Sequence, residues 1–108
     1  MAGGPRSLVP QEVDVPTARW NDTVIARSER TVMVEGNHYF PPEDVDRSKL
    51  SDSARTSTCS WKGDATYFDV TVDGKVNSAA AWTYRQPKEK AEHIRDHVAF
   101  WGGIEISD

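Results

Sequence analysis

A two-residue turn, Asp73-Gly74, divides the most regular stretch of this chain. Asp-Gly readily adopts the positive φ angles that a tight β-hairpin needs. Before the turn, Phe68, Val70 and Val72 alternate with more polar residues, and after it Ala80, Trp82 and Tyr84 recur at every second position. Side chains alternate between the two faces of a strand. The pattern therefore predicts an antiparallel hairpin across residues 65–84, with Ala80, Trp82 and Tyr84 on one face.

The remaining segments predict a mainly β chain with a single helix. β-Branched residues at 23–27 and 31–35 flank a polar stretch, which is typical of a hairpin. We further expect a turn at Gly36-Asn37, short strands at 38–40 and 56–61, and a last hairpin around Gly102-Gly103. Residues 88–96 contain good helix formers after Pro87 and predict one short helix.

The chain has 108 residues, which suits one folded domain. Pro5, Pro10 and Pro16 interrupt residues 1–19, and no apolar period runs through them. Proline cannot donate to a strand ladder or continue a helix. We therefore expect an irregular N-terminal arm at 1–19 and one β-rich domain at 20–108.

The charge of the chain argues against polyanionic partners. Its formal net charge is −4 at pH 7, and acidic and basic residues are interspersed. A nucleic-acid or anionic membrane surface needs a basic stripe, which this sequence lacks. No apolar run approaches the roughly 20 residues that span a bilayer, and residues 1–10 lack the apolar core of a secretory signal. These features predict a cytoplasmic protein that binds neither nucleic acid nor membrane, and they leave its oligomeric state open.

The metal-binding residue types are sparse. Cys59 is the single cysteine, so neither an internal disulfide nor a multi-cysteine zinc site can form within one chain. His93 and His97 have the spacing of zinc ligands on a helix, with His38 as a conceivable third ligand. However, Ile94 stands where a metalloprotease helix has Glu. We predict no metal and no cofactor.

Aromatic residues and a few charged ones form the most suggestive set of site candidates. Trp and Tyr walls with one or two charges can bind a small, flat or cationic ligand, although such rings can equally fill the space between two small sheets. The leading hypothesis is that a small molecule or a modified residue binds between the sheets. Its predicted ligand-binding residues are Tyr39, Trp61, Trp82, Tyr84, Glu35 and Lys62.

Two other functions stay open. A small enzyme could use Cys59 as nucleophile, Lys62 as its cationic helper or Glu35 as a general base. Strand alternation separates Cys59 from Lys62, so a turn beginning at Lys62 is needed to bring the two together. A protein-interaction module that adds a partner strand to a sheet edge is the third possibility.

An ordered set of short motifs resembles one bacterial and fungal family, the family catalogued as domain of unknown function 427. The motifs are Trp20, Val24-Ile25-Ala26-Arg27-Ser28, Val34-Glu35-Gly36, Tyr39-Phe40-Pro41, Asp44-Val45, Thr58-Cys59-Ser60-Trp61-Lys62-Gly63, Ala80-Ala81-Trp82, Tyr84, Pro87 and Val98-Ala99-Phe100. The resemblance covers nearly everything from Trp20 to Ile106.

The resemblance implies a β-tent, or Mss4-like, fold, in which two small antiparallel sheets lean on each other. Relatives with that shape often carry four zinc-binding cysteines, whereas this chain has Cys59 alone. The family sometimes carries a nucleotidyltransferase label (NTP_transf_9). Asp69 and Asp73 lack the close carboxylate arrangement of those enzymes, and no Gly-rich phosphate loop is present.

Overall fold

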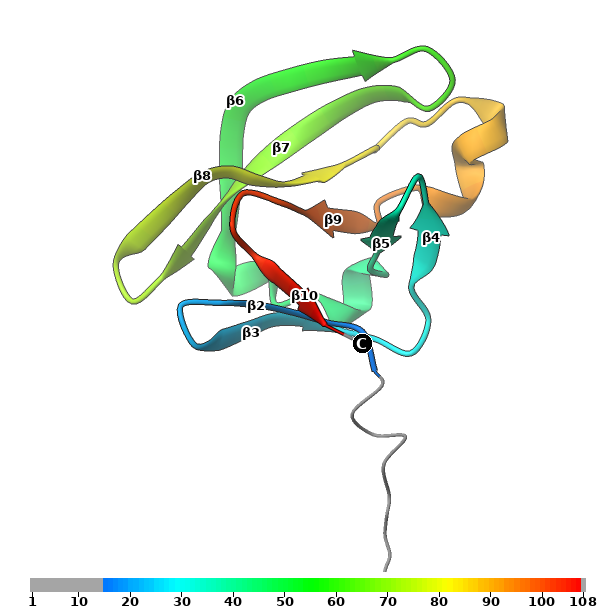
Figure 1. The fold of residues 1–108 in the computed structure, drawn as a ribbon. Helices are drawn as coiled ribbons and strands as arrows, with labels where there is room; N and C mark the ends of the chain where they lie inside the picture. The colour runs from blue at the N-terminus through cyan, green and yellow to red at the C-terminus, as the bar shows by residue number, and fades with distance from the viewer. Residues whose placement is uncertain (1–14, 108) are drawn as a thin grey trace, which may run out of the picture.

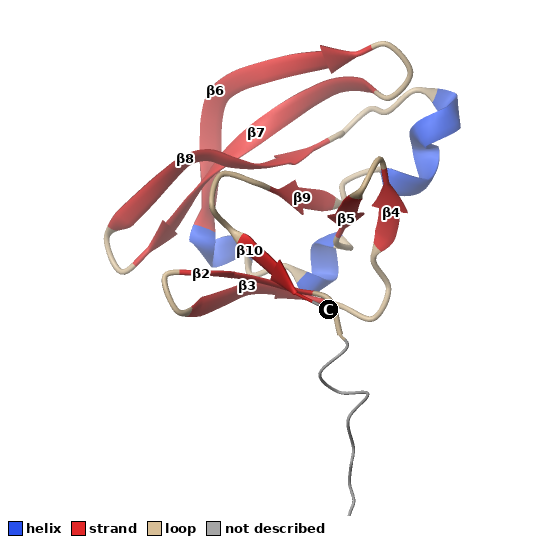
Figure 2. Ribbon diagram, viewed as in Figure 1, coloured by secondary structure: helices blue, strands red, loops and turns tan. Residues whose placement is uncertain are grey.

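The computed structural model describes residues 15–107, and almost all of their regular structure is β-strand (Figures 1 and 2). The predicted mainly β class is confirmed. The described strands form three antiparallel sheets. Of the predicted arm, residues 1–14 lie outside the described residues, while Thr17–Arg19 already belong to a strand.

The largest sheet has four strands in the order β6-β7-β8-β9. They are β6 (Leu50–Cys59), β7 (Gly63–Val72), β8 (Lys75–Thr83) and β9 (Val98–Phe100). The Asp73-Gly74 hairpin is confirmed: Val72 pairs with Lys75, and the two turn residues have φ angles of 51° and 79°. This hairpin is the left-hand arm in Figure 1.

Two smaller sheets pair segments differently from the sequence prediction. β2 (Thr17–Trp20) lies between β3 (Thr23–Arg27) and β10 (Glu105–Ser107), and β4 (Val32–Val34) pairs with β5 (Asn37–Tyr39). The predicted hairpin of 23–27 with 31–35 is therefore wrong, as is the pairing across Gly102-Gly103. Instead, β3 and β10 both pair with the N-terminal strand β2, β4 pairs with β5, and β9 pairs with β8. Strand propensity does not reveal which strand is the partner.

The helix predicted at 88–96 is a six-residue 3-10 helix, η4 (Glu89–Ile94). Its buried residues, Ala91 and Ile94, are three apart, and the 3-10 helix has three residues per turn, so it places both on one side. An α-helix of this length would also be marginal in water. Two shorter 3-10 helices, η2 (Pro42–Asp44) and η3 (Arg47–Lys49), lead into β6 (Figure 2).

The four-stranded sheet buries a hydrophobic cluster on each face. The first cluster lies against the β10-β2-β3 sheet and includes Ile25, Phe40, Phe68 and Val70. The second lies against the β4-β5 hairpin and η4, and includes Tyr39, Tyr67, Tyr84 and Ile94. Alternation along β7 thus sends Phe68 to one cluster and Tyr67 to the other, as the sequence pattern predicts.

The expected single face for Ala80, Trp82 and Tyr84 is wrong. Ala80 packs in the first cluster, whereas Trp82 and Tyr84 belong to the second. The β7-β8 register is irregular between Phe68 and Val70, and Ala79 has a φ of 52°. A bulge of this kind interrupts the alternation. No helix within residues 15–107 is long and apolar enough to cross a membrane.

Candidate functional site

A hollow of about 260 Å³ opens on the side of the second cluster. Five of the six predicted ligand-binding residues line it, the exception being Trp61. The hollow is lined by Glu35, Asn37, Tyr39, Lys62, Tyr67, Trp82, Tyr84 and Trp101. These residues come from the β4-β5 hairpin, β7, β8 and the segments that follow Cys59, β8 and β9.

The aromatic rings contact one another in edge-to-face and in tilted pairs. Trp82 is the centre of the group: its ring centroid lies 6.2 Å from that of Tyr39, 6.2 Å from that of Trp101 and 6.3 Å from that of Tyr67. Its indole Nε1 donates to the Tyr39 hydroxyl at 3.2 Å. Edge-to-face pairs of this geometry stabilise a cluster and hold the rings in defined orientations. Part of the aromatic set is therefore packing, and the hollow lies beside it.

Glu35 stands at the tip of the β4-β5 hairpin rather than at the end of a strand. The turn residues are Glu35 and Gly36, with φ angles of 53° and 83°, and Asn37 already lies in β5. A positive φ is uncommon for a residue with a β-carbon. From this position Glu35 accepts hydrogen bonds from the Lys62 ammonium and, at 3.2 Å, from the Trp61 Nε1. Trp61 therefore reaches the site through Glu35.

Lys62 is a buried cation in the turn between β6 and β7, with only 5% of its surface exposed. Lys88 N donates to Lys62 O at 2.9 Å and fixes this turn against the segment before η4. Gly63 follows with a φ of 111°, and a β-carbon there would meet Gln86 O at 3.4 Å. That distance is an ordinary van der Waals contact, so it is the positive φ that favours glycine at this position.

One carboxylate and two aromatic rings stabilise the Lys62 ammonium. Its Nζ forms an ion pair with Glu35 and lies 5.2 Å from the Trp61 ring centroid and 5.7 Å from that of Tyr84. Burial lowers the pKa of Lys62, but the Glu35 hydrogen bond and the neighbouring Tyr and Cys groups outweigh it and raise the pKa above its ordinary value. The hydrogen bonds from Lys62 and Trp61 lower the pKa of Glu35. Both groups are therefore charged at neutral pH.

Tyr84 contributes a buried hydroxyl without a hydrogen-bond partner among residues 15–107. The residue is 5% exposed and lines the hollow. Burial raises the pKa of Tyr84 to about 12, and that of Tyr39 is also raised by burial. Both phenols are therefore neutral O–H groups at neutral pH and can donate hydrogen bonds.

Sequence reasoning missed four residues of the site: Asn37, Tyr67, Trp101 and Arg55. The Arg55 guanidinium carbon lies 4.8 Å from the Tyr67 ring centroid and 5.0 Å from that of Trp101. Alternation along β7 could have placed Tyr67 beside Trp82, but the bulge shifts the register that a regular hairpin would give.

The bulge also positions Trp101. Asp69 Oδ1 accepts a hydrogen bond from Ala79 N at 2.8 Å, and Trp101 Nε1 donates to Ala79 O at 2.6 Å. The strained backbone at Ala79 is thus held from both sides, and its carbonyl orients the Trp101 ring toward Trp82. No local sequence signal announces this contact, because it joins residues 22 positions apart.

Cys59, the candidate nucleophile, ends β6 just before the turn that contains Lys62. Burial raises the pKa of its thiol. The backbone N–H groups of Trp61 and Lys62 and the charge of Lys62 outweigh that effect and lower the pKa below its ordinary value. The turn that the catalytic hypothesis requires is therefore present. Cys59 is half-buried and does not line the hollow.

The residues considered as metal ligands do not gather. Within residues 15–107 no three His, Cys, Asp or Glu side chains lie where they could hold one metal ion. His97 Nδ1 lies 3.0 Å from Arg95 O, and His38 Nδ1 lies 2.8 Å from Thr31 Oγ1.

A protein family described as a domain of unknown function (DUF427) matches residues 9–106. The match begins earlier than the resemblance read from the motifs, which started at Trp20, and so takes in β2 and part of the segment before it. No curated protein matches the chain.

Proposed function

We propose a ligand-binding function for this chain, which belongs to the protein family described as domain of unknown function 427. In this proposal the hollow beside Trp82 takes a small planar molecule, or one modified side chain of another protein, that presents a hydrogen-bond acceptor. Tyr39, Trp82 and Tyr84 form its walls. Lys62 and Tyr84 supply the donors, and Glu35 with Trp61 holds Lys62 in place.

The unpartnered hydroxyl of Tyr84 carries this proposal. A buried donor without a partner costs about 1–3 kcal/mol, so buried polar groups almost always have partners. Lys62 has three N–H donors, of which only one goes to a carboxylate among the described residues. An acceptor bound in the hollow would satisfy both groups at once.

The side chains that cover the aromatic faces favour a ligand with a hydrogen-bond acceptor over a cationic ligand. Arg55 already covers the Tyr67 and Trp101 rings, and Lys62 lies over the Trp61 and Tyr84 rings. A cationic ligand would have to displace one of these side chains to reach a ring face. The volume of about 260 Å³ lies just under the roughly 300–1,000 Å³ of drug-sized ligand sites. It suits a ligand of about one ring.

Three one-ring probes test the proposal: benzamide, benzoate and trimethylphenylammonium, observed by saturation-transfer NMR. We expect benzamide and benzoate to bind and the ammonium probe to bind least. Trp82→Ala should weaken binding about tenfold because a wall is lost. Tyr84→Phe should weaken it about fivefold because one donor is lost while the ring stays.

Trp20→Ala is the matched control, because Trp20 packs against the first cluster. It should leave probe binding unchanged, and all variants should retain a cooperative unfolding transition. The proposal fails if none of the probes binds, if Trp20→Ala weakens binding as much as Trp82→Ala, or if the ammonium probe binds best.

A catalytic role for Cys59 is the second candidate function, favoured by its lowered pKa beside Lys62. A larger thiolate fraction at neutral pH speeds alkylation. We expect iodoacetamide to alkylate Cys59 faster than a small-molecule thiol at neutral pH, with iodide as the leaving group. Lys62→Gln should slow the reaction about threefold, because it removes the charge that favours the thiolate. Mass spectrometry of the time course measures both rates, and a thiol as slow as the model compound would remove the nucleophilic hypothesis.

The third candidate, strand addition, predicted a large apolar edge. β6 is an edge strand of the four-stranded sheet, and its residues are mostly Ser, Thr and charged. Polar edges of this kind deter strand pairing. We therefore favour the hollow over the sheet edge.

We also propose that the chain is a β-tent, or Mss4-like, domain without the zinc site. Small antiparallel sheets that share a core support this kinship. The turns around Glu35-Gly36 and Ser60-Trp61-Lys62 are joined by the Glu35–Lys62 ion pair. A measured zinc content of one ion per purified chain would contradict this.

A further inference from the structure

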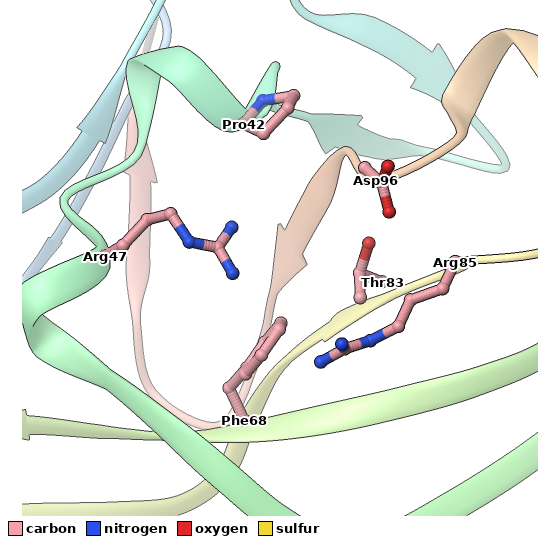
Figure 3. A pocket seen from close by; sticks show the side chains of 6 residues that line it. All are labelled: Pro42, Arg47, Phe68, Thr83, Arg85 and Asp96. Carbon is pink, nitrogen blue, oxygen red and sulfur yellow. The ribbon is translucent and has the colours of Figure 1, made fainter.

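A second hollow lies on the opposite face of the four-stranded sheet and belongs to none of the candidate functions discussed above. Its volume is about 270 Å³, and its lining is Pro42, Arg47, Phe68, Thr83, Arg85 and Asp96. Thr83 and Arg85 alternate with Trp82 and Tyr84 along β8 and the residues after it, which explains why the two hollows are on opposite faces. Figure 3 shows the six side chains around this space.

Two arginines converge on this hollow from different elements. Arg47 comes from η3 and Arg85 follows β8, and both guanidinium groups reach over the same ring (Figure 3). The guanidinium carbons lie 5.7 Å and 5.6 Å from the Phe68 centroid. Like charges brought to one ring repel each other, and an anion between them would offset that repulsion.

Within residues 15–107, neither guanidinium pairs with a buried carboxylate. Among residues 15–107, Arg47 forms no ion pair, and the ion pair of Arg85 is with the 88% exposed Asp52, at 3.7 Å. Arg85 Nε donates to Thr66 Oγ1 at 3.2 Å, which orients the side chain, and the 3.7 Å contact with Asp52 is longer than a hydrogen bond. Paired guanidinium forks are the donors that best fit phosphate and carboxylate groups.

The other side of the hollow offers acceptors. The Asp96 carboxylate accepts no hydrogen bond from the described residues, and Figure 3 shows it directed toward the space above Thr83. Thr83 Oγ1 donates its proton to His97 O at 2.7 Å, so toward the hollow this oxygen can only accept. A molecule bound here would therefore meet cations at one end and acceptors at the other.

We propose that this second hollow binds a small oxyanion that also carries a hydrogen-bond donor. Arg47 and Arg85 hold its phosphate or carboxylate group over Phe68. Asp96 and Thr83 accept from an amine or hydroxyl at its far end. The site is independent of the aromatic hollow, so it stands or falls separately from the function proposed above.

Isothermal titration with four probes tests the site: phosphoethanolamine, methyl phosphate, inorganic phosphate and β-alanine. Phosphoethanolamine carries both groups, methyl phosphate lacks the amine, and β-alanine replaces phosphate by carboxylate. We expect saturable binding of phosphoethanolamine or of β-alanine. Which of the two binds shows whether the site prefers a phosphate or a carboxylate group. We also expect phosphoethanolamine to bind more tightly than methyl phosphate if the phosphate is preferred.

Variants assign the binding to the side chains. Arg47→Gln and Arg85→Gln should each weaken binding about tenfold or more. Arg47→Lys and Arg85→Lys, which keep the charge but lose the fork, should weaken it less. Asp96→Asn should remove the advantage of phosphoethanolamine over methyl phosphate. Asp96 has a φ of 61°, which Asn tolerates, so this variant keeps the fold.

Lys75→Gln changes the net charge equally at the far end of β8 and is the matched control. It should leave binding unchanged. The proposal is overturned if no probe binds saturably, if Lys75→Gln weakens binding as much as Arg47→Gln, or if the two arginine variants together still bind as the parent chain does. Probe binding that disappears in Tyr84→Phe would instead assign it to the aromatic hollow.

Discussion

Phe40→Ala is expected to lower the free energy of unfolding by about 3–5 kcal/mol. Phe40 is fully buried in the first cluster. Its ring meets that of Phe100 at 5.6 Å between centroids and an interplanar angle of 71°. Truncation removes this buried area and leaves a cavity that the surrounding strands can only partly fill.

Backbone hydrogen bonds next to Phe40 make the cavity difficult to close. Phe40 N donates to Val98 O at 2.8 Å, and Val98 N donates to Phe40 O at 2.9 Å. These bonds join the residue after β5 to β9 and do not depend on the side chain, so the backbone is expected to stay in place around the lost ring. A domain of this size has about 5–15 kcal/mol of stability, which makes this one ring a large share of it.

Urea unfolding followed by tryptophan fluorescence measures the effect. Phe40→Leu keeps most of the volume and should cost less than about 1.5 kcal/mol. Met33→Ala is the surface control, since Met33 is 54% exposed, and it should change stability by less than about 0.5 kcal/mol. A Phe40→Ala chain as stable as the Met33→Ala chain would contradict this account of the core.

Local signals in the sequence predicted the local parts of the fold. Asp73-Gly74 and the alternation on both sides predicted the β7-β8 hairpin, because a two-residue turn fixes its partner strand. The pairing of β10 with β2 joins residues about 90 positions apart, as with Ile106 and Ala18. Nothing in either strand specifies that partner, so hairpins between sequence neighbours were predicted instead.

The candidate site shows the same division. The rings and charges named from the sequence do meet, because the turns at Glu35-Gly36 and Ser60-Trp61-Lys62 bring their residues to one place. Trp101 and Arg55 were missed because their positions depend on the bulge at Ala79 and on cation–π contacts. Bulges and long-range contacts of this kind leave no periodic trace in a sequence.

The two substitutions that break the Glu35–Lys62 ion pair, one on each side, should lower stability by unequal amounts. Glu35→Gln leaves a buried ammonium without its counter-charge, which is strongly unfavourable. Lys62→Met leaves a carboxylate whose side chain is 53% exposed, so water can solvate it. We expect Glu35→Gln to lower the urea midpoint clearly, and Lys62→Met to change the free energy of unfolding by no more than about 1 kcal/mol.

The pH dependence of the stability that each side chain contributes distinguishes an ion pair from simple packing. The folded-state pKa of Glu35 lies below its ordinary value of 4.5. Its contribution is therefore complete above that value and is lost as the pH falls through the folded pKa. The folded-state pKa of Lys62 lies above 10.5, so its contribution is complete below that pH and is lost as the pH rises through the folded pKa.

The gap in urea midpoint between the parent chain and Glu35→Gln should therefore be full at neutral pH and close on acidification. Protonated Glu35 and Gln then leave Lys62 in the same position, because neither carries a charge. Glu29→Gln is the control, since Glu29 is also an exposed acidic residue, and its midpoint should stay close to that of the parent chain across the same range. A Glu35→Gln gap that is as large in acid as at neutral pH would mean that the side chain acts by packing, and the charged pairing that holds Lys62 at the hollow would be wrong.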